Sequence, residues 1–269
     1  MSTRWAGPVD VLLLGVGSSG GSPALGCACP TCTSGDPRNV RTRASALLRA
    51  GGQTFLIDTG PDLRQQVLRE QILHVDAVLY THPHADHLNG IDDLRAFCWL
   101  QKAALPVYAN RLMATHLRER FPYTLLQPND FWDKPVLTLH EIESEPLQHG
   151  GVWLEPIPLL HGKWPILGWR LGGVAYLTDV SAISAESLQR LQGLELLLLD
   201  CLRDKPHPTH LSVEEAIALA TRIGAKHTVM IHMTHELEYH ALSARLPAGM
   251  SVGYDGLKLQ INGASDEPT

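Results

Sequence analysis

Apolar runs of strand length recur along almost the whole chain and are separated by short polar turns. They are rich in Val, Ile and Leu, a composition typical of buried strands. We predict strands at residues 11–16, 46–50, 54–57, 75–80, 106–109, 136–139, 152–160, 174–177, 194–199 and 228–231. Many of these strands follow one another without a helix between them. Two packed sheets with helices outside therefore fit the pattern better than a regular alternation of strand and helix.

Helical periodicity occurs in the longer gaps between these strands, at residues 61–71, 92–101, 111–120, 185–191, 212–223 and 236–244. The clearest helix begins at Ser212, where Ser212 and Glu215 match a capping box and apolar residues follow at helical spacing. The chain shows no linker, low-complexity run or repeat of fixed period. The predicted fold class is therefore α/β (α+β), organised as a single domain over residues 1–269.

Several predicted strands end in side chains that can bind a metal ion, namely Asp58, His82, His161, Asp179, Asp200 and His232. The densest group of such side chains is the run Thr81–His87. His82 and His84 are two apart on an extended stretch, so both can reach one ion. Asp86 and His87 lie where the chain turns into a helix, so they can face a second ion. Two-metal sites suit in-line displacement at phosphorus or attack on an acyl carbon, which indicates a metal-dependent hydrolase.

Three of the five cysteines are crowded together, at Cys27, Cys29 and Cys32. Three thiols at this spacing can chelate one tetrahedral Zn²⁺, and His235 is a candidate for the fourth ligand. We predict a zinc-binding loop near residues 26–33, and a trio of reactive thiols is the open alternative. Cys98 and Cys201 lie in patterns typical of buried elements and are predicted to be inert core thiols.

Charge and hydropathy narrow the class of partner. The net charge is −6 and no basic run is present, so wholesale binding to a nucleic-acid backbone is not expected. The clustered Arg38, Arg41 and Arg43 are predicted to form a solvated face, and a local basic patch is the open alternative. No run reaches the roughly 18 apolar residues that a membrane helix requires, and the N-terminus lacks the apolar core of a signal peptide. A cytoplasmic location without membrane contact is the resulting expectation.

The His-rich loop, followed in order by His161, Asp179 and His232, resembles the metallo-β-lactamase superfamily from about residue 9 to 259. The resemblance implies a four-layer αββα sandwich with a dinuclear metal site at one edge, holding two divalent ions (Mn²⁺ or Zn²⁺). It implies one ion on His82, His84 and His161, a second on Asp86, His87 and His232, and Asp179 between them. Asp58 matches a motif that orients the ligand loop in this family.

Further motifs resemble one branch, the phosphoribosyl 1,2-cyclic phosphate phosphodiesterases of the carbon–phosphorus lyase pathway. These motifs are the Gly-rich turn at 15–23, the Cys-x-Cys-x₂-Cys, the pair His232 and His235, and residues 252–256, which resemble a C-terminal strand. The resemblance implies a dinuclear phosphodiesterase that opens a small cyclic phosphate by metal-hydroxide attack. It also implies a homodimer and a structural Zn²⁺ on Cys27, Cys29, Cys32 and His235.

The resemblance further implies that Asp86 and His210 are the catalytic residues, with His210 as general acid or charge stabiliser. His207 competes with His210 for this role, and a loop histidine without function is the other open alternative. The substrate pocket is expected to form from loops at 122–135 and 161–169. Trp164 and Trp169 are candidate lining residues, and core or surface packing of these two side chains is the equally open alternative.

Other functions remain open at this point. A tRNA 3′-processing endonuclease would share the ligand set, but such enzymes use an inserted basic arm that the sequence does not suggest. A non-hydrolytic carrier related to pyrroloquinoline quinone biosynthesis would share the cysteine cluster but has altered active-site ligands, whereas the ligands here are intact. Thioester or lactone hydrolysis by the same ions also stays open. The polar tail, residues 263–269, is expected to be disordered.

Overall fold

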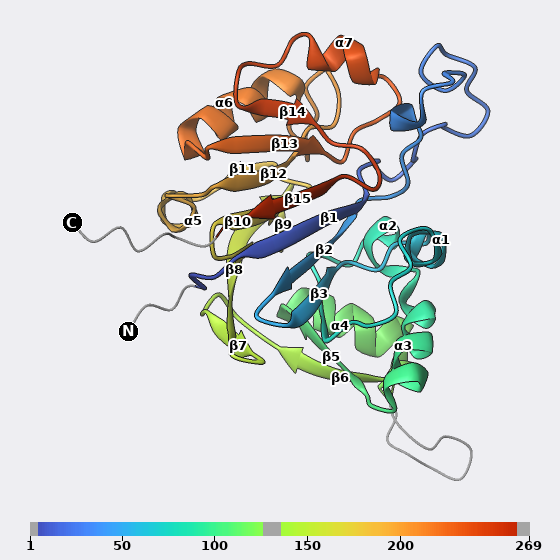
Figure 1. Cartoon of the computed structure of the whole chain (residues 1–269), viewed down its shortest axis with the longest axis vertical. Helices are drawn as coiled ribbons and strands as arrows, with labels where there is room; N and C mark the ends of the chain where they lie inside the picture. Colours follow the sequence, from blue (N-terminus) through green and yellow to red (C-terminus); the bar gives the residue numbers. More distant parts are fainter. Residues whose placement is uncertain (1–4, 126–135, 263–269) are drawn as a thin grey trace.

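The protein is described by a computed structural model that covers residues 5–125 and 136–262. Residues 126–135 of the predicted pocket loop at 122–135, and the tail at 263–269, lie outside the described residues. Two sheets dominate the described part (Figure 1).

The first sheet consists of β1 (Val9–Gly15), β2 (Ser45–Ala50), β3 (Gln53–Ile57), β4 (Ala77–Leu79), β5 (Leu105–Ala109), β6 (Leu137–Glu141) and β15 (Lys258–Ile261). Their spatial order is β15–β1–β2–β3–β4–β5–β6. Strands β15, β1, β2 and β3 pair antiparallel, and β3 to β6 pair parallel.

The second sheet consists of β7 (Leu147–His149), β8 (Val152–His161), β9 (Trp164–Leu171), β10 (Val174–Leu177), β11 (Ala182–Ile183), β12 (Leu196–Asp200), β13 (His227–Ile231) and β14 (Met250–Val252). Their order is β11–β8–β9–β10–β12–β13–β14, and β7 pairs with β8. Strands β10, β12, β13 and β14 run parallel, so their carboxyl ends meet at one edge of the sheet.

The helices are α1 (Leu63–Arg69), α2 (Ala85–Leu88), α3 (Leu94–Gln101), α4 (Arg111–Arg120), α5 (Ala185–Arg190), α6 (Val213–Ile223) and α7 (Tyr239–Ser243). Three short 3₁₀ turns, η1 (Pro37–Asn39), η2 (Ile91–Asp93) and η3 (Pro122–Thr124), complete the described elements. The predicted capping box is present: the Ser212 hydroxyl accepts from the Glu215 amide, and the Glu215 carboxylate accepts from the Ser212 amide.

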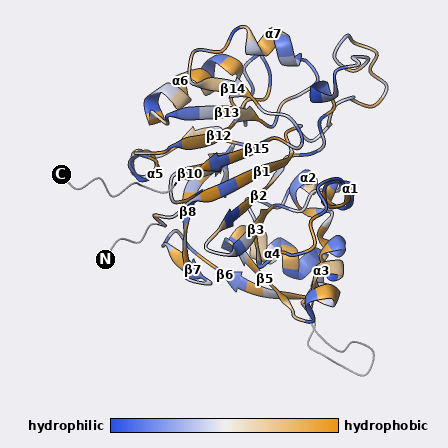
Figure 2. Cartoon of the chain, viewed as in Figure 1, coloured by the Kyte–Doolittle hydropathy of each residue, from blue (hydrophilic) through white to orange (hydrophobic). Residues whose placement is uncertain are grey.

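Alternation along β1 explains the layers. Val11 and Leu13 point into the core shared by both sheets, whereas Leu12 and Leu14 point to the opposite face and pack with residues of α1, α3 and α4. On the other side of the molecule, α5, α6 and α7 contact β8, β12 and β14. The arrangement is helix, sheet, sheet, helix, with apolar residues along the strands of both sheets (Figures 1 and 2). The predicted αββα sandwich is confirmed.

Every strand predicted from an apolar run is present, but the prediction of a loop at 161–169 is wrong. These residues belong to a hairpin in which β8 ends at His161, Gly162 and Lys163 form the turn, and β9 begins at Trp164. Pro165 and Gly168 interrupt the apolar run of β9 and hid the strand in the sequence. The strand expected at 252–256 is also displaced, because β14 ends at Val252 and the chain turns before β15.

The predicted helix at 236–244 is shorter than expected, because Glu238 caps α7 and accepts from the Ala241 amide at 2.8 Å. Among the arginines expected to be solvated, Arg41 is only 1% exposed, so that prediction is wrong for this residue. Its guanidinium donates to the carbonyls of Thr234 and Leu237 at 3.0 and 2.6 Å. Arg41 is thus a buried brace between distant segments.

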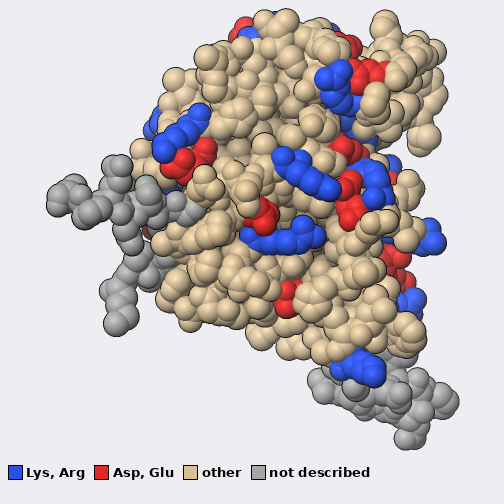
Figure 3. Space-filling view, in the orientation of Figure 1, with Lys and Arg blue, Asp and Glu red and all other residues tan. Residues whose placement is uncertain are grey.

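Charges on the face drawn in Figure 3 are mixed, with Lys and Arg side chains lying among Asp and Glu. Among the described residues, no helix is both long and apolar enough to cross a membrane.

Candidate metal centre

Strand ends bring the predicted ligands together. The loop after β4 carries His82 and His84 and leads into α2, and the side chains of His161, Asp179 and His232 come from the ends of β8, β10 and β13. Their ligand atoms form two groups, each within 4.8 Å: His82, His84, His161 and Asp179 in one, and Asp86, His87 and His232 in the other. These groups match the two sets that the family resemblance implies.

Asp179 lies between the two groups. Its Oδ1 is 3.7 Å from His82 Nε2, and its Oδ2 is 3.2 Å from His87 Nε2 and 3.4 Å from His232 Nε2. The Thr178 hydroxyl donates to Oδ2 at 2.6 Å and fixes the carboxylate, which is 2% exposed. One carboxylate oxygen therefore faces each group, the geometry that a bridging ligand requires.

Hydrogen bonds on the far side of the imidazoles fix which nitrogen faces the centre. His87 Nδ1 donates to Asp58 Oδ2 at 2.7 Å, and His161 Nδ1 donates to the Thr209 carbonyl at 2.8 Å. Asp58 also accepts from the amide and the hydroxyl of Thr81 at 2.8 and 2.7 Å, so it ties the ligand loop to the end of β3. The Nε2 atoms are thereby left free to bind a metal, and Asp58 has the orienting contacts expected of it.

Buried nitrogen atoms without partners fit a metal centre. Within the described residues, His87 Nε2 and both ring nitrogens of His232 are buried and make no hydrogen bond, although carboxylate oxygens lie 3.2 to 3.6 Å away. A buried polar nitrogen without a partner destabilises the folded protein, unless a metal ion or another group binds it. Imidazole and carboxylate donors arranged around shared points fit divalent ions such as Zn²⁺, Mn²⁺, Fe²⁺ or Co²⁺ and do not select among them.

The electrostatics of the two groups differ. Burial lowers the pKa of three imidazoles, His82, His84 and His161. Burial would also lower the pKa of His232, but the nearby carboxylates of Asp179 and Asp200 raise it to about 10. The pKa of His87 is raised well above its usual value, against burial, by Asp86 and Asp179. The carboxylates around these two imidazoles thus favour positive charge, which divalent ions can supply in place of protons.

His210 borders this centre. Its ring stacks on that of His232 with centroids 5.0 Å apart, and its Nε2 lies 3.7 Å from Asp179 Oδ1. His207, the competing candidate, lies further out, with its ring 5.1 Å from that of His210. Of the two histidines, His210 is the one in reach of the ligands.

Asp200 also belongs to the site, although the sequence indicated only that it ends a strand. Its Oδ1 lies 3.4 Å from His210 Nδ1 and 3.3 Å from His232 Nδ1, and its Oδ2 accepts from the Leu211 amide at 3.0 Å. The side chain is fully buried. One carboxylate therefore faces both stacked imidazoles from behind and can keep their Nε2 atoms directed at the centre. Its position at the end of an apolar run was the available signal.

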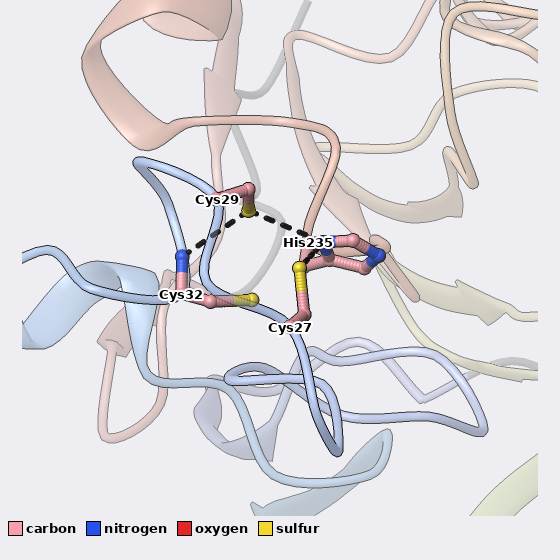
Figure 4. Close-up of side chains that lie close together, drawn as sticks. All are labelled: Cys27, Cys29, Cys32 and His235. Carbon is pink, nitrogen blue, oxygen red and sulfur yellow. Dashed lines mark hydrogen bonds between the residues drawn. The ribbon is translucent and has the colours of Figure 1, made fainter.

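The second predicted metal site is also assembled (Figure 4). Ligand atoms of Cys27, Cys29, Cys32 and His235 all lie within 4.8 Å of one another. His235 Nδ1 is 3.5 Å from Cys27 Sγ and 3.4 Å from Cys29 Sγ, and no disulfide joins the thiols. The hydrogen bond with His235 is the main cause that lowers the pKa of Cys29 to about 6. Three thiols and one imidazole form a donor set that fits tetrahedral Zn²⁺.

The remaining candidates divide. Cys201 is fully buried, whereas Cys98 is partly exposed on α3 and its thiol donates to the Val136 carbonyl at 2.9 Å. Trp169 is 1% exposed and donates to the Tyr80 carbonyl at 3.1 Å, so it is a core residue and does not line a pocket. Trp164 is 38% exposed and lies beside the ring of His84.

Comparison with known proteins agrees with this geometry. The model of the β-lactamase superfamily domain matches residues 53–233. The crystal structure of a diphosphatase from the PhnP family is 39% identical, has a TM-score of 0.89, and covers 95% of this chain and 98% of its own. Zn²⁺-bound PqqB from Methylobacterium extorquens, at 21% identity and a TM-score of 0.73, shares the fold and covers 93% of this chain and 99% of its own.

Among curated relatives, the octanoyltransferase of Porphyromonas gingivalis is 40% identical over 255 residues, which is 93% of this chain but only 51% of that protein. A coenzyme PQQ synthesis protein B of Rhodopseudomonas palustris is 30% identical over 48% of this chain and 44% of its own length. The chain thus spans about half the length of these two relatives. The family match, which covers most of the chain, shows that this protein belongs to the β-lactamase superfamily and has the fold of its metal-dependent hydrolases.

Proposed function

We propose that the protein is a dinuclear metal-dependent hydrolase of phosphoric esters, acting on a small phosphodiester or phosphoanhydride. One observation carries the proposal: Asp179 presents Oδ1 to the group with His82 and Oδ2 to the group with His87 and His232. Two-metal sites with one shared carboxylate suit in-line displacement at phosphorus.

Each predicted ligand receives a role in this proposal. One ion would be held by His82, His84 and His161, the second by Asp86, His87 and His232, and Asp179 would bridge them. Two divalent ions bound there would supply a hydroxide nucleophile at neutral pH and positive charge for the phosphoryl oxygens. A third ion, a structural Zn²⁺, would be held by Cys27, Cys29, Cys32 and His235.

The protein's own groups would do the proton chemistry. His210 points Nε2 toward Asp179 and Nδ1 toward Asp200, so it can carry a proton at Nε2 to the leaving oxygen. Asp200 would hold the imidazole in that orientation and stabilise its protonated form. Asp86 would act as ligand and catalytic carboxylate at the second ion, where its Oδ2 is 3.2 Å from His87 Nε2.

The substrate class rests on the similar diphosphatase of the PhnP family. A phosphoanhydride and a cyclic phosphodiester such as a phosphoribosyl 1,2-cyclic phosphate present the same reacting centre, a phosphorus with an oxygen leaving group. Ribonuclease Z of Mycolicibacterium paratuberculosis is 27% identical over 85% of this chain and 95% of its own length. This similarity supports the alternative proposal, in which the phosphodiester that is hydrolysed belongs to an RNA. The net charge of −6 favours a small substrate over RNA.

The test is hydrolysis of bis(p-nitrophenyl) phosphate by chelator-stripped protein reloaded with Mn²⁺ or Zn²⁺. We expect turnover only after reloading, and a loss of at least 100-fold in kcat for Asp179→Asn, with metal content measured on the same samples. Asp92→Asn is the control, because Asp92 is half exposed and lies in η2, outside the site. Octanoyl and acetyl thioesters are assayed in parallel. Turnover of thioesters without turnover of any phosphoric ester would overturn the proposal.

A further inference from the structure

A row of aromatic rings borders the proposed dinuclear site. From one end to the other the rings are His116, Trp164, His84, His161, His210 and His207, and successive centroids are 6.2, 4.9, 5.0, 4.7 and 5.1 Å apart. His84 and His161 are proposed ligands and His210 the proposed proton donor. The end formed by Trp164 and His116 has no role in the hydrolysis as described so far.

Strand pairing explains why Trp164 faces the site. In the β8–β9 hairpin, Trp164 is the cross-strand partner of His161, and cross-strand partners in an antiparallel pair project from the same face. The indole therefore lies on the side of the ligand His161 and against the ligand His84. It is nonetheless 38% exposed, an unusual exposure for a tryptophan that is packed only to fill a core.

Backbone contacts just after Trp164 anchor the strand that carries it. The next residue, Pro165, accepts through its carbonyl from the Asn110 side chain at 3.0 Å, at the start of α4. Further along β9, the Leu167 amide donates to the Thr81 carbonyl at 3.1 Å, in the ligand loop itself. His116 comes from α4 and is partly exposed. The backbone that carries the indole is thus anchored before any substrate arrives, which lowers the entropic cost of presenting a binding surface.

We infer that Trp164 is a specificity-determining residue that stacks on a flat ring carried by the substrate. If His210 protonates the leaving oxygen, the leaving group lies at the His210 end of the row. The substituent retained on phosphorus then extends toward the other end, where Trp164 exposes its ring. The preferred substrate is a phosphoric ester or anhydride whose retained group bears a nucleobase or similar heterocycle. This inference rests on the proposed function and adds the class of the retained group.

Two esters with the same leaving group test the inference. Thymidine 5′-(p-nitrophenyl) phosphate retains a nucleoside, and methyl p-nitrophenyl phosphate retains a methyl group. For the metal-loaded wild type we expect kcat/KM to favour the thymidine ester about tenfold, the effect of one base–aromatic stack. Trp164→Ala should remove this preference mainly through KM, and Trp164→Phe should restore most of it. Trp99→Ala, at a tryptophan that is 80% exposed on α3, is the matched control and should keep the preference.

A second measurement separates this inference from the proposed function. Binding of thymidine 5′-monophosphate and methyl phosphate to metal-loaded protein is measured by calorimetry, with metal content determined for each variant. We expect the nucleotide to bind about tenfold more tightly to wild type and Trp99→Ala, and equally to Trp164→Ala. If the wild type hydrolyses neither ester, the proposed function fails, and the binding ratio still decides the role of Trp164. If Trp164→Ala weakens the binding of both ligands equally, or loses metal, the inference is wrong, and Trp164 only shields the His84 ring from solvent.

Discussion

Asp58 offers a sharp test of how the ligand loop is held. It is fully buried and belongs to neither group of proposed ligands, yet it accepts three hydrogen bonds. Oδ1 accepts from the Thr81 amide at 2.8 Å, and Oδ2 accepts from the Thr81 hydroxyl and from His87 Nδ1 at 2.7 Å each. All three partners are donors, so the site requires two acceptor oxygens.

Asp58→Asn keeps the shape and removes one acceptor. In either orientation of the amide, its NH₂ faces a donor: the Thr81 amide in one case, and His87 Nδ1 with the Thr81 hydroxyl in the other. His87 can relieve the second conflict only by moving its proton to Nε2, the atom that faces the proposed ion. Replacing a residue that hydrogen-bonds a metal ligand typically weakens metal affinity by about 10- to 100-fold, which corresponds to about 1.4–2.8 kcal/mol of binding free energy.

The assay is retention of metal by the variant during dialysis against graded chelator, followed by elemental analysis and by activity at increasing Mn²⁺. We expect Asp58→Asn to lose about one active-site ion at chelator concentrations that the wild type tolerates, and to regain activity at high Mn²⁺. Asp76→Asn is the matched control, because Asp76 also accepts from a backbone amide and a histidine but lies outside the site. Equal metal retention in Asp58→Asn and wild type would refute the role of Asp58.

Two further predictions concern packing and the cysteine loop. In Gly60→Ala the added Cβ would lie 2.2 Å from the Asp86 carbonyl oxygen, so we expect the free energy of unfolding, measured in urea, to fall by about 1–3 kcal/mol. Gly20→Ala is the control, because Gly20 has open space around it, and it should change this free energy by less than about 0.5 kcal/mol. In protein stripped of metal, the rate of alkylation of Cys29 should fall as the pH drops through about 6, because the thiolate is then protonated. His235→Ala should shift the midpoint of this pH dependence upward. A midpoint near pH 9 in the wild type would contradict the contact between Cys29 and His235.

The part of the site that sequence predicted best is the part whose geometry is local. His82 and His84 reach one group because an extended chain places residues two apart on one side, and Asp86 and His87 reach the other because the chain turns into α2. Spacing alone carries this information. The assignment of His161 required the family resemblance, because no local pattern links residues that are so far apart in sequence.

Contacts between distant segments were not readable from the sequence. Arg41 was predicted to be solvated, because the sequence around it does not indicate that it binds the distant carbonyls of Thr234 and Leu237. Asp200 could be recognised only as a polar strand end, since its two imidazole neighbours come from a loop and from another strand. Trp164 was placed in a loop, because Pro165 masked the strand that fixes it.

Backbone conformation joins these observations. Asp58, Asp179 and His232 have φ of 60°, 57° and 58°, a left-handed conformation that costs about 1–2 kcal/mol for a residue with a Cβ. Each lies within two residues of a strand end, where the chain must turn away from the sheet. Asp tolerates this conformation better than most residues, and His also occurs there more often than average. The same unfavourable conformation recurs at three strand ends that converge on one site. This recurrence argues that the proposed metal site, rather than the packing of the sheets, requires the conformation.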